Sequence, residues 1–401
     1  MNKKMKRKIL IIVENLPVPF DTRVWQEATT LVENGYTVSV ICPKGKGYEK
    51  KYERLSGVHI YRHDLPEEGS GFLGYVKEYG TALREELRLA KRVYEKIGFD
   101  VIHGCNPPDD IYMIARYFRK YGVKYVFDHH DICPELFEAK FGKRGLLYKS
   151  QTWLERQTYK NAAFAFVTNE SYKRIAVKRG KMDPEKVYVL RSGPKLERLR
   201  IQPPKPELKG GRKYMVGYLG VIGKQEGIPY LLEAARYIKE NLKRDDICYG
   251  IIGGGTSLEE MKSLSVQMGL DDIVTFTGRA PDAVMLDYLN TADICVNPDE
   301  YNAMNDKSTM NKVLEYMALG KPIVQFDLTE GRYSAREASL YAKPNDSVDM
   351  AKKIVSLLDD EEKRKKMSAF GRKRIVEELS WEHTSKVLLE GYEVFFAEMG
   401  K

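Results

Sequence analysis

The sequence predicts an α/β protein with two doubly wound domains, each built on a parallel sheet. Short apolar runs rich in β-branched residues alternate with helix-length stretches through the first half of the chain, and the same alternation starts again after a break at 203–211. Strands separated by helices pair in parallel and are covered on both faces. The length, 401 residues, is also more than one hydrophobic core comfortably fills. We therefore expect two domains.

The first domain is predicted to span residues 1–202. Its buried strands correspond to the apolar runs 9–13, 37–42, 58–61, 101–103, 124–127, 164–167 and 187–190. The last stretch of the chain, about 382–401, has the pattern of a helix with one apolar face. That face consists of Val387, Leu388, Tyr392, Phe395 and Phe396. We expect this helix to pack back on the first domain.

The second domain is predicted to span residues 203–381. It begins at a linker in which Pro203, Pro204 and Pro206 precede Gly210 and Gly211, residues that interrupt helices and strands alike. Strand-like runs follow at 214–219, 248–252, 273–276, 294–297, 323–326 and 340–342, separated by helices of about 10 to 15 residues. Doubly wound folds bind ligands beyond the carboxyl ends of their strands. The loops after these strands are therefore the candidate sites.

Composition and local patterns exclude several classes of protein. The longest uncharged apolar run near the start, residues 9–13, ends at Glu14 and is too short for a signal peptide or a membrane span. The five cysteines lie far apart without a C-x-x-C pair, which disfavours a disulfide framework or structural zinc. The patterns G-x-x-x-x-G-K-[ST], D-x-D and G-x-S-x-G do not occur. We expect a cytoplasmic protein.

Positive charge is concentrated in the first half of the chain. The formal net charge of +9 divides into +13 for residues 1–200, with 38 Lys and Arg against 25 Asp and Glu, and −4 for residues 201–401, with 28 against 32. The basic groups are Lys3, Lys4, Lys6, Arg7 and Lys8; Arg84, Arg88, Lys91 and Arg92; Lys173, Arg174, Lys178, Arg179 and Lys181; and Lys143, Arg144 and Lys149 among Phe141, Leu146, Leu147, Tyr148 and Trp153. A peripheral contact with the inner face of an anionic membrane is one interpretation, and an ordinary solvated surface is the other.

The segment 305–322 carries the strongest pattern for ligand binding. Ser308 or Thr309 can cap the helix that follows, leaving backbone N–H groups and a positive dipole end that favour a diphosphate. Lys312 adds charge one turn on, and Glu315, about two turns beyond Ser308, can accept hydrogen bonds from sugar or ribose hydroxyls. The alternative is a capped surface helix with a solvated Glu315.

Two glycine-rich loops follow the first two strands of the second domain. Their glycines are Gly217, Gly220, Gly223 and Gly227 in the first and Gly253, Gly254 and Gly255 in the second. Such loops let the backbone approach a phosphate, which Lys224 could neutralise. Neither loop matches the dinucleotide fingerprint, and a tight strand-to-helix turn is the alternative for both.

The run Asp128, His129, His130 and Asp131 follows the strand 124–127. Adjacent side chains on an extended segment point to opposite sides, so at most one histidine should face a given site. We therefore expect an imidazole reaching into a cleft, or a buried hydrogen-bonded histidine, rather than a metal centre.

Two further loops of the first domain carry candidate residues. Asp21 and Arg23 precede the first helix, and Asn106 and Asp109 flank two prolines after the strand 101–103. Both loops could contact an acceptor. The alternatives are a helix cap with a surface salt bridge for the first and a plain Pro-Pro turn for the second.

Taken in order along nearly the whole chain, these segments resemble the family-four retaining glycosyltransferases of GT-B fold. The resemblance is carried by D-T-R-V-W-Q-E-A at 21–28 with Gly35 and Val38, His130 with Asp131, the loops 220–227 and 253–255, F-T-G-R at 276–279, the segment 315–322, and Ser380 with Trp381. It implies two Rossmann-like domains facing a cleft, with the first on the acceptor side and the second holding a nucleotide-sugar donor.

The resemblance also implies roles for individual residues. Glu315 would hold the donor ribose, the backbone at 308–311 would meet the diphosphate and sugar, Arg279 would lie beside the base, and His130 would approach the donor sugar and the departing phosphate. The family acts by front-face displacement, so we expect no protein nucleophile, no metal and no cofactor beyond the co-substrate. The predicted donor-binding residues are Asp306, Ser308, Thr309, Asn311, Lys312, Glu315, Gly223, Lys224, Gly253, Gly254, Arg279 and Arg332, and the acceptor-side residues are Asp21, Arg23, Asn106 and Asp131.

Three positions depart from the usual family pattern. The first Glu of the paired E-x7-E falls at Lys307, beside Asp306, and the Arg and Lys of the glycine loop fall at Val221 and Glu226. The diphosphate still needs positive partners in a closed cleft. Lys224, Lys312 and Arg332 are the predicted substitutes.

The sequence thus predicts a retaining, metal-independent glycosyltransferase that moves a sugar from a UDP or GDP sugar to a saccharide or lipid-linked saccharide, in cell-surface polysaccharide biosynthesis. A nucleotide-sugar epimerase of the same fold is the second interpretation. A basic nucleic-acid-binding protein is the third, against which stands the lack of any helix-turn-helix or RNA-recognition pattern in the sequence.

Overall fold

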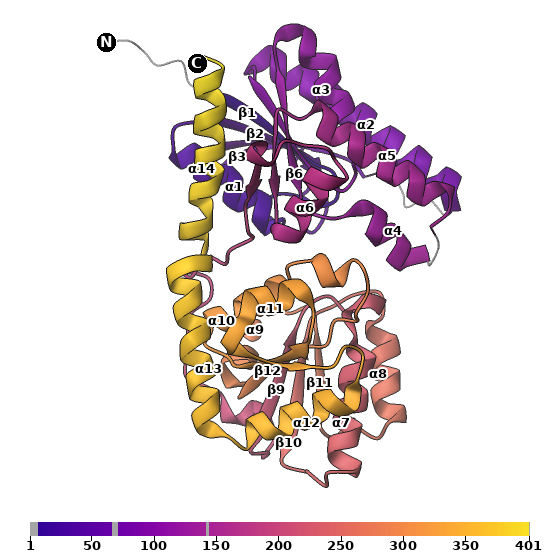
Figure 1. Cartoon of the computed structure of the whole chain (residues 1–401), viewed down its shortest axis with the longest axis vertical. Helices are drawn as coiled ribbons and strands as arrows, with labels where there is room; N and C mark the ends of the chain where they lie inside the picture. The colour runs from indigo at the N-terminus through magenta and orange to yellow at the C-terminus, as the bar shows by residue number, and fades with distance from the viewer. Residues whose placement is uncertain (1–6, 66–70, 142–143, 401) are drawn as a thin grey trace. The chain divides into compact units, whose positions relative to one another are not determined.

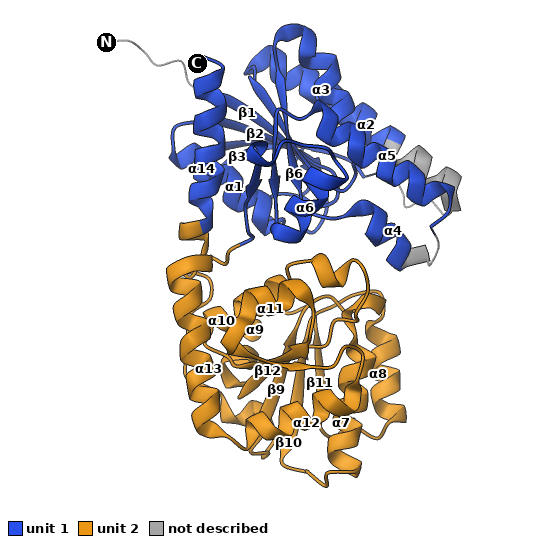
Figure 2. Ribbon diagram, viewed as in Figure 1, with its two compact units in different colours: residues 1–192, 384–401 blue, residues 193–383 orange. Residues whose placement is uncertain are grey.

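Each half of the chain forms a sheet flanked by helices, in a computed structural model that describes residues 7–65, 71–141 and 144–400 (Figure 1). The chain divides into unit 1, Met1–Ser192 with Thr384–Lys401, and unit 2, Gly193–His383 (Figure 2). Lys3, Lys4, Lys6 and Lys143 of the predicted basic groups, and the side chain of Phe141, lie outside what the structure describes.

Unit 1 contains an eight-stranded sheet in the order β3-β4-β2-β1-β5-β6-β7-β8. Its strands are β1 (Lys8–Val13), β2 (Thr37–Pro43), β3 (Tyr52–Leu55), β4 (Val58–His63), β5 (Val101–Cys105), β6 (Lys124–His129), β7 (Phe164–Val167) and β8 (Val187–Val189). All neighbours are parallel except β3 and β4. From β1 the chain builds outward to β2 on one side and returns to β5 on the other, so the switch point lies between β1 and β5.

The edge strand β3 is one that the sequence pattern did not predict. Its four residues alternate between exposed and half-buried, so they contain no apolar run. Ser56 and Gly57, with φ of 45° and 83°, form the two-residue turn that brings the chain back antiparallel onto β4. Positive φ at both turn residues matches the twist of a hairpin. The first sheet is therefore mixed rather than wholly parallel.

The helices of unit 1 are α1 (Thr22–Glu33), α2 (Gly71–Lys96), α3 (Tyr112–Phe118), α4 (Cys133–Phe141), α5 (Leu146–Asn161), α6 (Glu170–Lys178) and most of α14 (Trp381–Glu398). The apolar face of α14 packs on this unit. The ring of Tyr392 lies 5.7 Å from that of Phe164 and 5.9 Å from that of Phe166, and Leu388 and Phe396 are fully buried. The C-terminal helix is thus part of the first core.

Unit 2 contains a six-stranded sheet in the order β11-β10-β9-β12-β13-β14, with all neighbours parallel. The strands are β9 (Tyr214–Leu219), β10 (Ile247–Ile252), β11 (Val274–Gly278), β12 (Ile294–Asn297), β13 (Ile323–Phe326) and β14 (Ser339–Ala342). The helices are α7 (Ile228–Glu240), α8 (Leu258–Gln267), α9 (Asp282–Thr291), α10 (Asn311–Ala318), α11 (Thr329–Ala335), α12 (Ser347–Leu358) and α13 (Glu361–Arg374). Two clusters of buried side chains form its core. The switch point lies between β9 and β12.

The second unit begins at Gly193, ten residues before the predicted boundary at 203. Leu199 is buried in its core with 1% exposure, and the backbone N–H groups of Gln202 and Lys205 donate to Asn290 and Thr291 at 3.0 and 2.8 Å. The Pro-rich segment does break regular structure, but it runs along the surface of unit 2 instead of separating the units. These contacts join distant parts of the chain, so the local pattern could not reveal them.

Candidate active site

The predicted polar residues of unit 1 lie where its parallel strands end. Asp21 and Arg23 follow β1, Asn106 follows β5, and His130 and Asp131 follow β6. Because the carboxyl ends of parallel strands meet at one edge of a sheet, residues far apart in sequence come together there. This edge contains the switch point of unit 1.

His130 lies against Asp128. The imidazole Nε2 contacts Oδ2 of Asp128, and Arg23 binds the same carboxylate, with Nη2 2.7 Å from Oδ1 and Nε 3.3 Å from Oδ2. Burial acts to raise the pKa of Asp128, but Arg23 and His130 outweigh it and hold that pKa well below its usual range. Burial acts to lower the pKa of His130, yet the Asp128 carboxylate prevails and raises it. The side chain of His130 is 14% exposed, whereas that of Asp128 is fully buried.

Asn106 braces the segment that carries His130. Its Oδ1 accepts hydrogen bonds from the backbone N–H groups of His130 and Asp131, at 2.7 and 3.2 Å, and its Nδ2 donates to the carbonyl oxygen of Asp131 at 2.6 Å and to Asp109 at 2.9 Å. Asn106 is 1% exposed. It therefore fixes the loop after β6 rather than offering its side chain to an acceptor, which corrects its predicted role.

Arg23 and Asp21 also need correction as acceptor contacts. Arg23 is 7% exposed, and besides Asp128 its guanidinium donates to the carbonyl oxygen of Leu190 and to Ser192 Oγ at 2.9 and 3.0 Å. Arg23 therefore holds the C-terminal edge of the sheet in place from the protein interior. Asp21 caps α1, its Oδ1 accepting from the backbone N–H of Val24 at 3.0 Å, which is the structural alternative stated above.

The two adjacent histidines occupy different environments. His129 is fully buried and its Nδ1 bonds to the hydroxyl of Tyr159. Burial lowers the pKa of His129 to about 3, so this ring is neutral near pH 7. His130, in contrast, keeps part of its surface exposed at the sheet edge. One histidine is structural and the other is available to a ligand.

The structure brings together four side chains of types that can ligate metals, which no sequence spacing indicated. Glu27, Cys105, Asp128 and His130 each place one donor atom within 4.8 Å of the others. Arg23 Nε lies 3.1 Å from Glu27, and His103 Nε2 lies 3.4 Å from both Glu27 and Asp128. The carboxylates are thus already balanced by cationic side chains. Such a donor set fits a buried ion-pair cluster better than a divalent cation.

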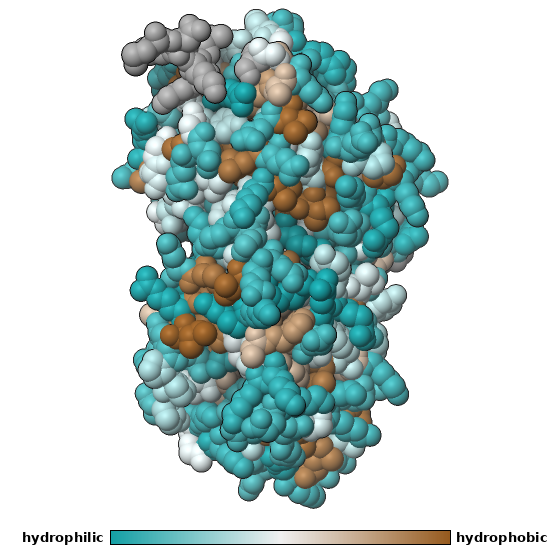
Figure 3. Space-filling model, turned by 60° about the vertical axis from the view of Figure 1, so that its left-hand side comes forward, coloured by the Kyte–Doolittle hydropathy of each residue, from teal (hydrophilic) through white to brown (hydrophobic). Residues whose placement is uncertain are grey.

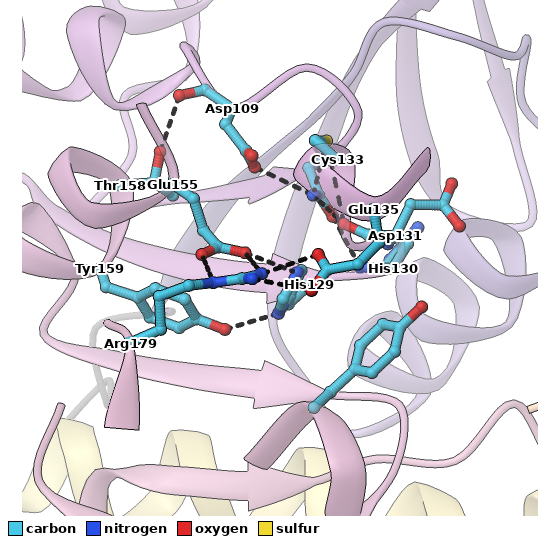
Figure 4. A network of polar contacts seen from close by, with 12 residues as sticks. Asp109, His129, His130, Asp131, Cys133, Glu135, Glu155, Thr158, Tyr159 and Arg179 are labelled. Atoms are coloured by element: carbon cyan, nitrogen blue, oxygen red, sulfur yellow. Dashed lines mark hydrogen bonds and ion pairs between the residues drawn. The ribbon is translucent and has the colours of Figure 1, made fainter. Parts of the chain in front are cut away.

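A second polar network lies beside the His130 segment (Figure 4). Arg179, which follows α6, binds Glu135 of α4 through Nη1 and Nη2 at 2.7 and 2.9 Å, and Glu155 of α5 through Nη2 at 2.7 Å. It fixes three helices to one another. Arg179 therefore does not belong to a solvated basic surface, where the sequence pattern had grouped it.

In unit 2 the glycine loops pack backbone against backbone at the C-terminal edge of the sheet. A Cβ on Gly253, at φ +147°, would lie 1.7 Å from the carbonyl oxygen of Gly220. A Cβ on Gly227, at φ +65°, would lie 1.8 Å from the carbonyl oxygen of Pro298. Only glycine fits at either position. The loops after β9, β10 and β12 thus approach one another without intervening side chains at the switch point.

Lys312 lies in this region and is neutralised by the chain's own carboxylates. Its Nζ lies 2.7 Å from Oδ1 of Asp299, 2.8 Å from Oε2 of Glu226 and 3.4 Å from the hydroxyl of Tyr218. Burial acts to lower the pKa of Lys312, but Asp299, Tyr218 and Glu226 outweigh it and raise that pKa well above its usual range. Lys312 is therefore not an unpaired charge for a diphosphate, contrary to the prediction.

Glu315, on α10, is held by Arg198. Arg198 Nη1 donates to Oε1 of Glu315 at 2.9 Å, while its Nε and Nη2 bind both oxygens of Asp282 at 2.8 and 3.0 Å. Burial raises the pKa of Glu315 and the Arg198 charge opposes that shift. The side chain of Glu315 is 18% exposed. A carboxylate reachable from solvent and oriented by an arginine therefore lies on α10, one turn after Lys312, which packs beside Gly220.

Two family models match the chain. The model described as Glycosyltransferase Family 4 matches residues 21–198, and the model described as Glycosyl transferases group 1 matches residues 201–374. Together they cover most of both units. The chain is a family-four glycosyltransferase of GT-B fold.

Individual proteins that are similar to this chain in sequence or in structure include other enzymes whose names refer to sugars. The α-maltose-1-phosphate synthase of Mycolicibacterium smegmatis is 26% identical over 298 residues, which cover 68% of this chain and 73% of that protein. The sucrose-phosphate synthase of Thermosynechococcus elongatus superposes with a TM-score of 0.80 at 17% identity, covering 98% of this chain and 100% of that one. Anabaena HepE, in complex with UDP and glucose, gives 0.74 at 13% identity, with the same coverage. The structural likenesses concern the fold.

The helix α10 of this glycosyltransferase begins at Asn311 and not at a cap formed by Ser308 or Thr309. Met310 is the N-cap residue, and no side chain caps the helix. Ser308 is extended after the 3-10 turn Asn305–Lys307, and its Oγ donates back to the carbonyl oxygen of Met304 at 2.8 Å. Asn311 and Glu315, four residues apart, share the helix face that had been assigned to Ser308 and Glu315.

The other residues of the glycosyltransferase that were predicted to bind the donor all follow the ends of strands. They differ in whether their charge is already paired within the protein. Lys224 is exposed after β9, and Arg279 after β11 lies beside Gly254. Arg332, on α11, is bound by Asp327 at 2.7 Å, and Asp306 accepts from the backbone N–H of Thr329 at 2.8 Å. Of the predicted substitutes for the family's cations, Lys224 is the one that faces solvent without an ion pair among the described residues.

Two residues of this glycosyltransferase that form ion pairs with predicted site residues were not identified from the sequence. Arg198 lies in a segment without a recognisable pattern and contacts Glu315, 117 residues later. Asp299 follows β12 and was not singled out. Its position just beyond the carboxyl end of a buried strand was the available signal, since that is where doubly wound sheets place functional side chains.

Proposed function

We propose that this glycosyltransferase moves a sugar from a UDP or GDP sugar to a saccharide or lipid-linked saccharide acceptor, with retention of anomeric configuration, in cell-surface polysaccharide biosynthesis. The observation that carries the proposal is the C-terminal edge of the unit 2 sheet, where glycine-lined loops meet α10 and the accessible carboxylate of Glu315. HepE, a protein of similar fold, forms a complex with UDP and glucose, which supports the choice of donor.

In this proposal the donor is bound by a few placed groups rather than by bulk charge. Glu315 accepts hydrogen bonds from the ribose hydroxyls, and Arg198 keeps its carboxylate oriented. The diphosphate is met by Lys224 and by backbone N–H groups of the glycine loops and of the start of α10. Because Lys312 is paired with Asp299 and Glu226, its contribution is to hold those loops together.

The chemical step in this proposal is displacement at the anomeric carbon without a protein nucleophile or a metal. The acceptor hydroxyl attacks on the face from which the diphosphate leaves, and a phosphate oxygen takes its proton. The protein then contributes positioning and stabilisation of the charge that develops on the leaving group. His130, whose pKa is raised by Asp128 against the effect of burial, supplies positive charge for that purpose.

Replacing Glu315 by alanine is expected to abolish most of the stabilisation that the cognate nucleotide confers. A ligand present at about 100 times its Kd stabilises a protein by about 2.7 kcal/mol, which a thermal-shift screen with UDP, GDP, ADP and CMP detects readily. The control is Glu259→Ala on α8, a carboxylate whose side chain is 81% exposed and which pairs only with Lys262 among the described residues. An unchanged nucleotide response in Glu315→Ala would remove Glu315 from the site, and no response to any nucleotide would contradict the proposed donor class.

We also propose that α5 contacts an anionic membrane surface. Leu146, Lys149, Trp153, Arg156 and Lys160 are all exposed, and their spacing places them along one face of the helix. Leu146 is 84% and Trp153 54% exposed. Large apolar side chains among cations are typical of interfacial helices, where each basic residue contributes about 1 kcal/mol.

None of the helices that the structure describes is long and apolar enough to cross a membrane. The face seen in Figure 3 is largely hydrophilic, with hydrophobic residues in separate patches.

The membrane proposal predicts flotation with phosphatidylglycerol vesicles at low salt and release at high salt, because the attraction is electrostatic. The double substitution Lys149→Glu and Lys160→Glu is expected to abolish flotation. The matched control reverses Lys363 and Lys366, two exposed cations of α13 in unit 2. Equal flotation of both double variants would contradict a contact through α5, and no flotation of the unaltered protein would contradict membrane binding itself.

A further inference from the structure

Asp128, a buried carboxylate in unit 1, contacts several polar side chains for which the proposed chemistry gives no reason. Asp128 is fully buried and receives hydrogen bonds or ion pairs from Arg23 on α1, His103 on β5 and His130 after β6. These three side chains come from three separate elements. Their convergence on one carboxylate raises the question of what that carboxylate does for His130.

The ionisation of Asp128 decides which nitrogen of His130 carries the proton. The pKa of Asp128 is held well below its usual range because Arg23 and His130 outweigh the effect of burial, so the group is a carboxylate near pH 7. An ionised carboxylate only accepts hydrogen bonds. The His130 nitrogen that contacts it, Nε2, must therefore carry a proton. Nδ1 is the ring nitrogen that Asp128 does not engage, and when the ring is charged it is a hydrogen-bond donor.

A second histidine connects this carboxylate to the C-terminal helix. His103 Nδ1 lies 2.7 Å from the hydroxyl of Tyr392 on α14, and its Nε2 lies 3.4 Å from both Asp128 and Glu27. Burial acts to lower the pKa of His103, but the carboxylates of Asp128 and Glu27 outweigh it and raise that pKa to about 9. The ring is thus charged near pH 7, and its Nδ1–H donates to the oxygen of Tyr392.

We propose that Asp128 is a positioning residue for His130, fixing its imidazole with Nε2 inward and Nδ1 outward, and that Tyr392 of α14 supports this arrangement through His103. The role of Nδ1 toward a donor phosphate rests on the proposed function. The orientation of the ring does not. The consequence is that the C-terminal helix takes part in the electrostatics of the candidate active site through two successive contacts, from Tyr392 to His103 and from His103 to Asp128.

The titratable and charged groups around this cluster come from every element packed on it. They are Asp21, Arg23 and Glu27 from α1 and its cap, His103 and Cys105 from β5, Asp128, His130 and Asp131 from β6 and its loop, and Tyr392 from α14. Burial raises the pKa values of Cys105 and Tyr392 well above their usual ranges, so both stay neutral near pH 7. Burial also raises the pKa values of the Glu27 and Asp131 carboxyl groups, and the pKa of His103 lies at about 9, so the titration of His130 has to be followed on its own ring signals.

The test is an NMR titration of the protein with isotope-labelled histidine, without any donor. The chain has six histidines, and single substitutions assign His103 and His130. We expect the unaltered protein to show neutral His130 as the Nε2–H tautomer. In Asp128→Asn the titration of His130 should move to lower pH, because the amide carries no counter-charge. The preference for Nε2–H should also be lost, because the amide has an N–H₂ donor as well as an oxygen acceptor and no longer requires a proton on Nε2. A folded Asp128→Asn protein with unchanged His130 tautomer and titration would overturn the proposal.

A second variant, Tyr392→Phe, tests the arrangement even if Asp128→Asn does not fold. Removal of the hydroxyl leaves His103 Nδ1–H without its acceptor, so the titration of His103 should move to lower pH and the His130 signals should shift with it. Tyr188→Phe is the matched control, since Tyr188 packs on Phe164 and Phe166 of the same sheet but does not contact the cluster. Unchanged His103 and His130 signals in Tyr392→Phe would contradict the relay.

A kinetic arm separates this inference from the proposed function. With any nucleotide sugar that supports turnover, Asp128→Asn should lower kcat about 10-fold or more and leave the nucleotide-induced thermal shift unchanged. Expected NMR changes without detectable sugar transfer in the unaltered protein would contradict the proposed function and leave the positioning role standing. Transfer activity with unchanged NMR signals would contradict the positioning role and leave the proposed function standing.

Discussion

Replacement of His130 by alanine is expected to lower kcat about 100-fold or more while the nucleotide-induced thermal shift persists, because in the proposed mechanism the imidazole stabilises charge that develops only as the diphosphate leaves. His130 lies on unit 1, at the edge formed by β5 and β6, and none of the groups proposed to bind the nucleotide belongs to that unit. The measurement is the rate of nucleotide release from the nucleotide sugar that gives the largest thermal shift, with acceptor and EDTA present.

His59→Ala is the control for this substitution. His59 is a second histidine of the same sheet, on β4, and it bonds to the hydroxyl of Tyr52, away from the cluster around Asp128. It should leave kcat unchanged. Equal rates for His130→Ala and the unaltered protein would exclude a catalytic role for His130. Loss of activity on adding EDTA would contradict the metal-independent mechanism, and formation of an epimer from the donor alone would assign the site to a nucleotide-sugar epimerase.

Replacement of Arg23 by alanine is expected to destabilise unit 1 by about 3–5 kcal/mol at neutral pH, because it leaves buried carboxylates without their cation. Arg23 binds Asp128 at 2.7 Å and lies 3.1 Å from Glu27, and both carboxyl groups are fully buried. Chemical denaturation followed by tryptophan fluorescence measures the effect, since Trp25 and Trp153, two of the three tryptophans, lie in unit 1.

The destabilisation should depend on pH in a defined direction. With Arg23 present, the pKa of Asp128 is depressed, so its contribution to stability exists above the pKa of the unfolded chain and is lost as pH falls. Without Arg23, the pKa values of both carboxyl groups should lie higher than in the unaltered protein, because Arg23 lowers each of them, so the variant recovers stability as they are protonated. The difference between variant and unaltered protein should therefore shrink as pH falls toward about 4.

Arg88→Ala provides the matched control for Arg23→Ala. Arg88 pairs with Glu85 one turn away on α2, and its side chain is 63% exposed. Its removal should change the free energy of unfolding by no more than about 0.5 kcal/mol. A similarly small effect of Arg23→Ala would contradict the view that this arginine neutralises the buried cluster.

Most strands could be predicted because burial on both faces requires an unbroken apolar run, as in β1 and β9. The edge strand β3 has no such run and was missed. Asn106 and His130 could be placed at strand ends, and hence at one edge, from the alternation of strands and helices alone. That Asn106 braces the backbone of His130 follows only from the register of β5 beside β6.

The order of residues along the chain was enough to indicate the family, the two α/β units, the loops that carry His130 and the glycines, and the helix that carries Glu315. It did not reveal which charges neutralise one another. Lys312 forms ion pairs with Asp299 and Glu226, Glu315 with Arg198, and Asp128 with Arg23. Most of these pairs join residues far apart in sequence, and their strength depends on burial, which is a property of the packed core. Local patterns locate a site at the ends of strands, whereas the charge that the site presents to a ligand is settled by packing.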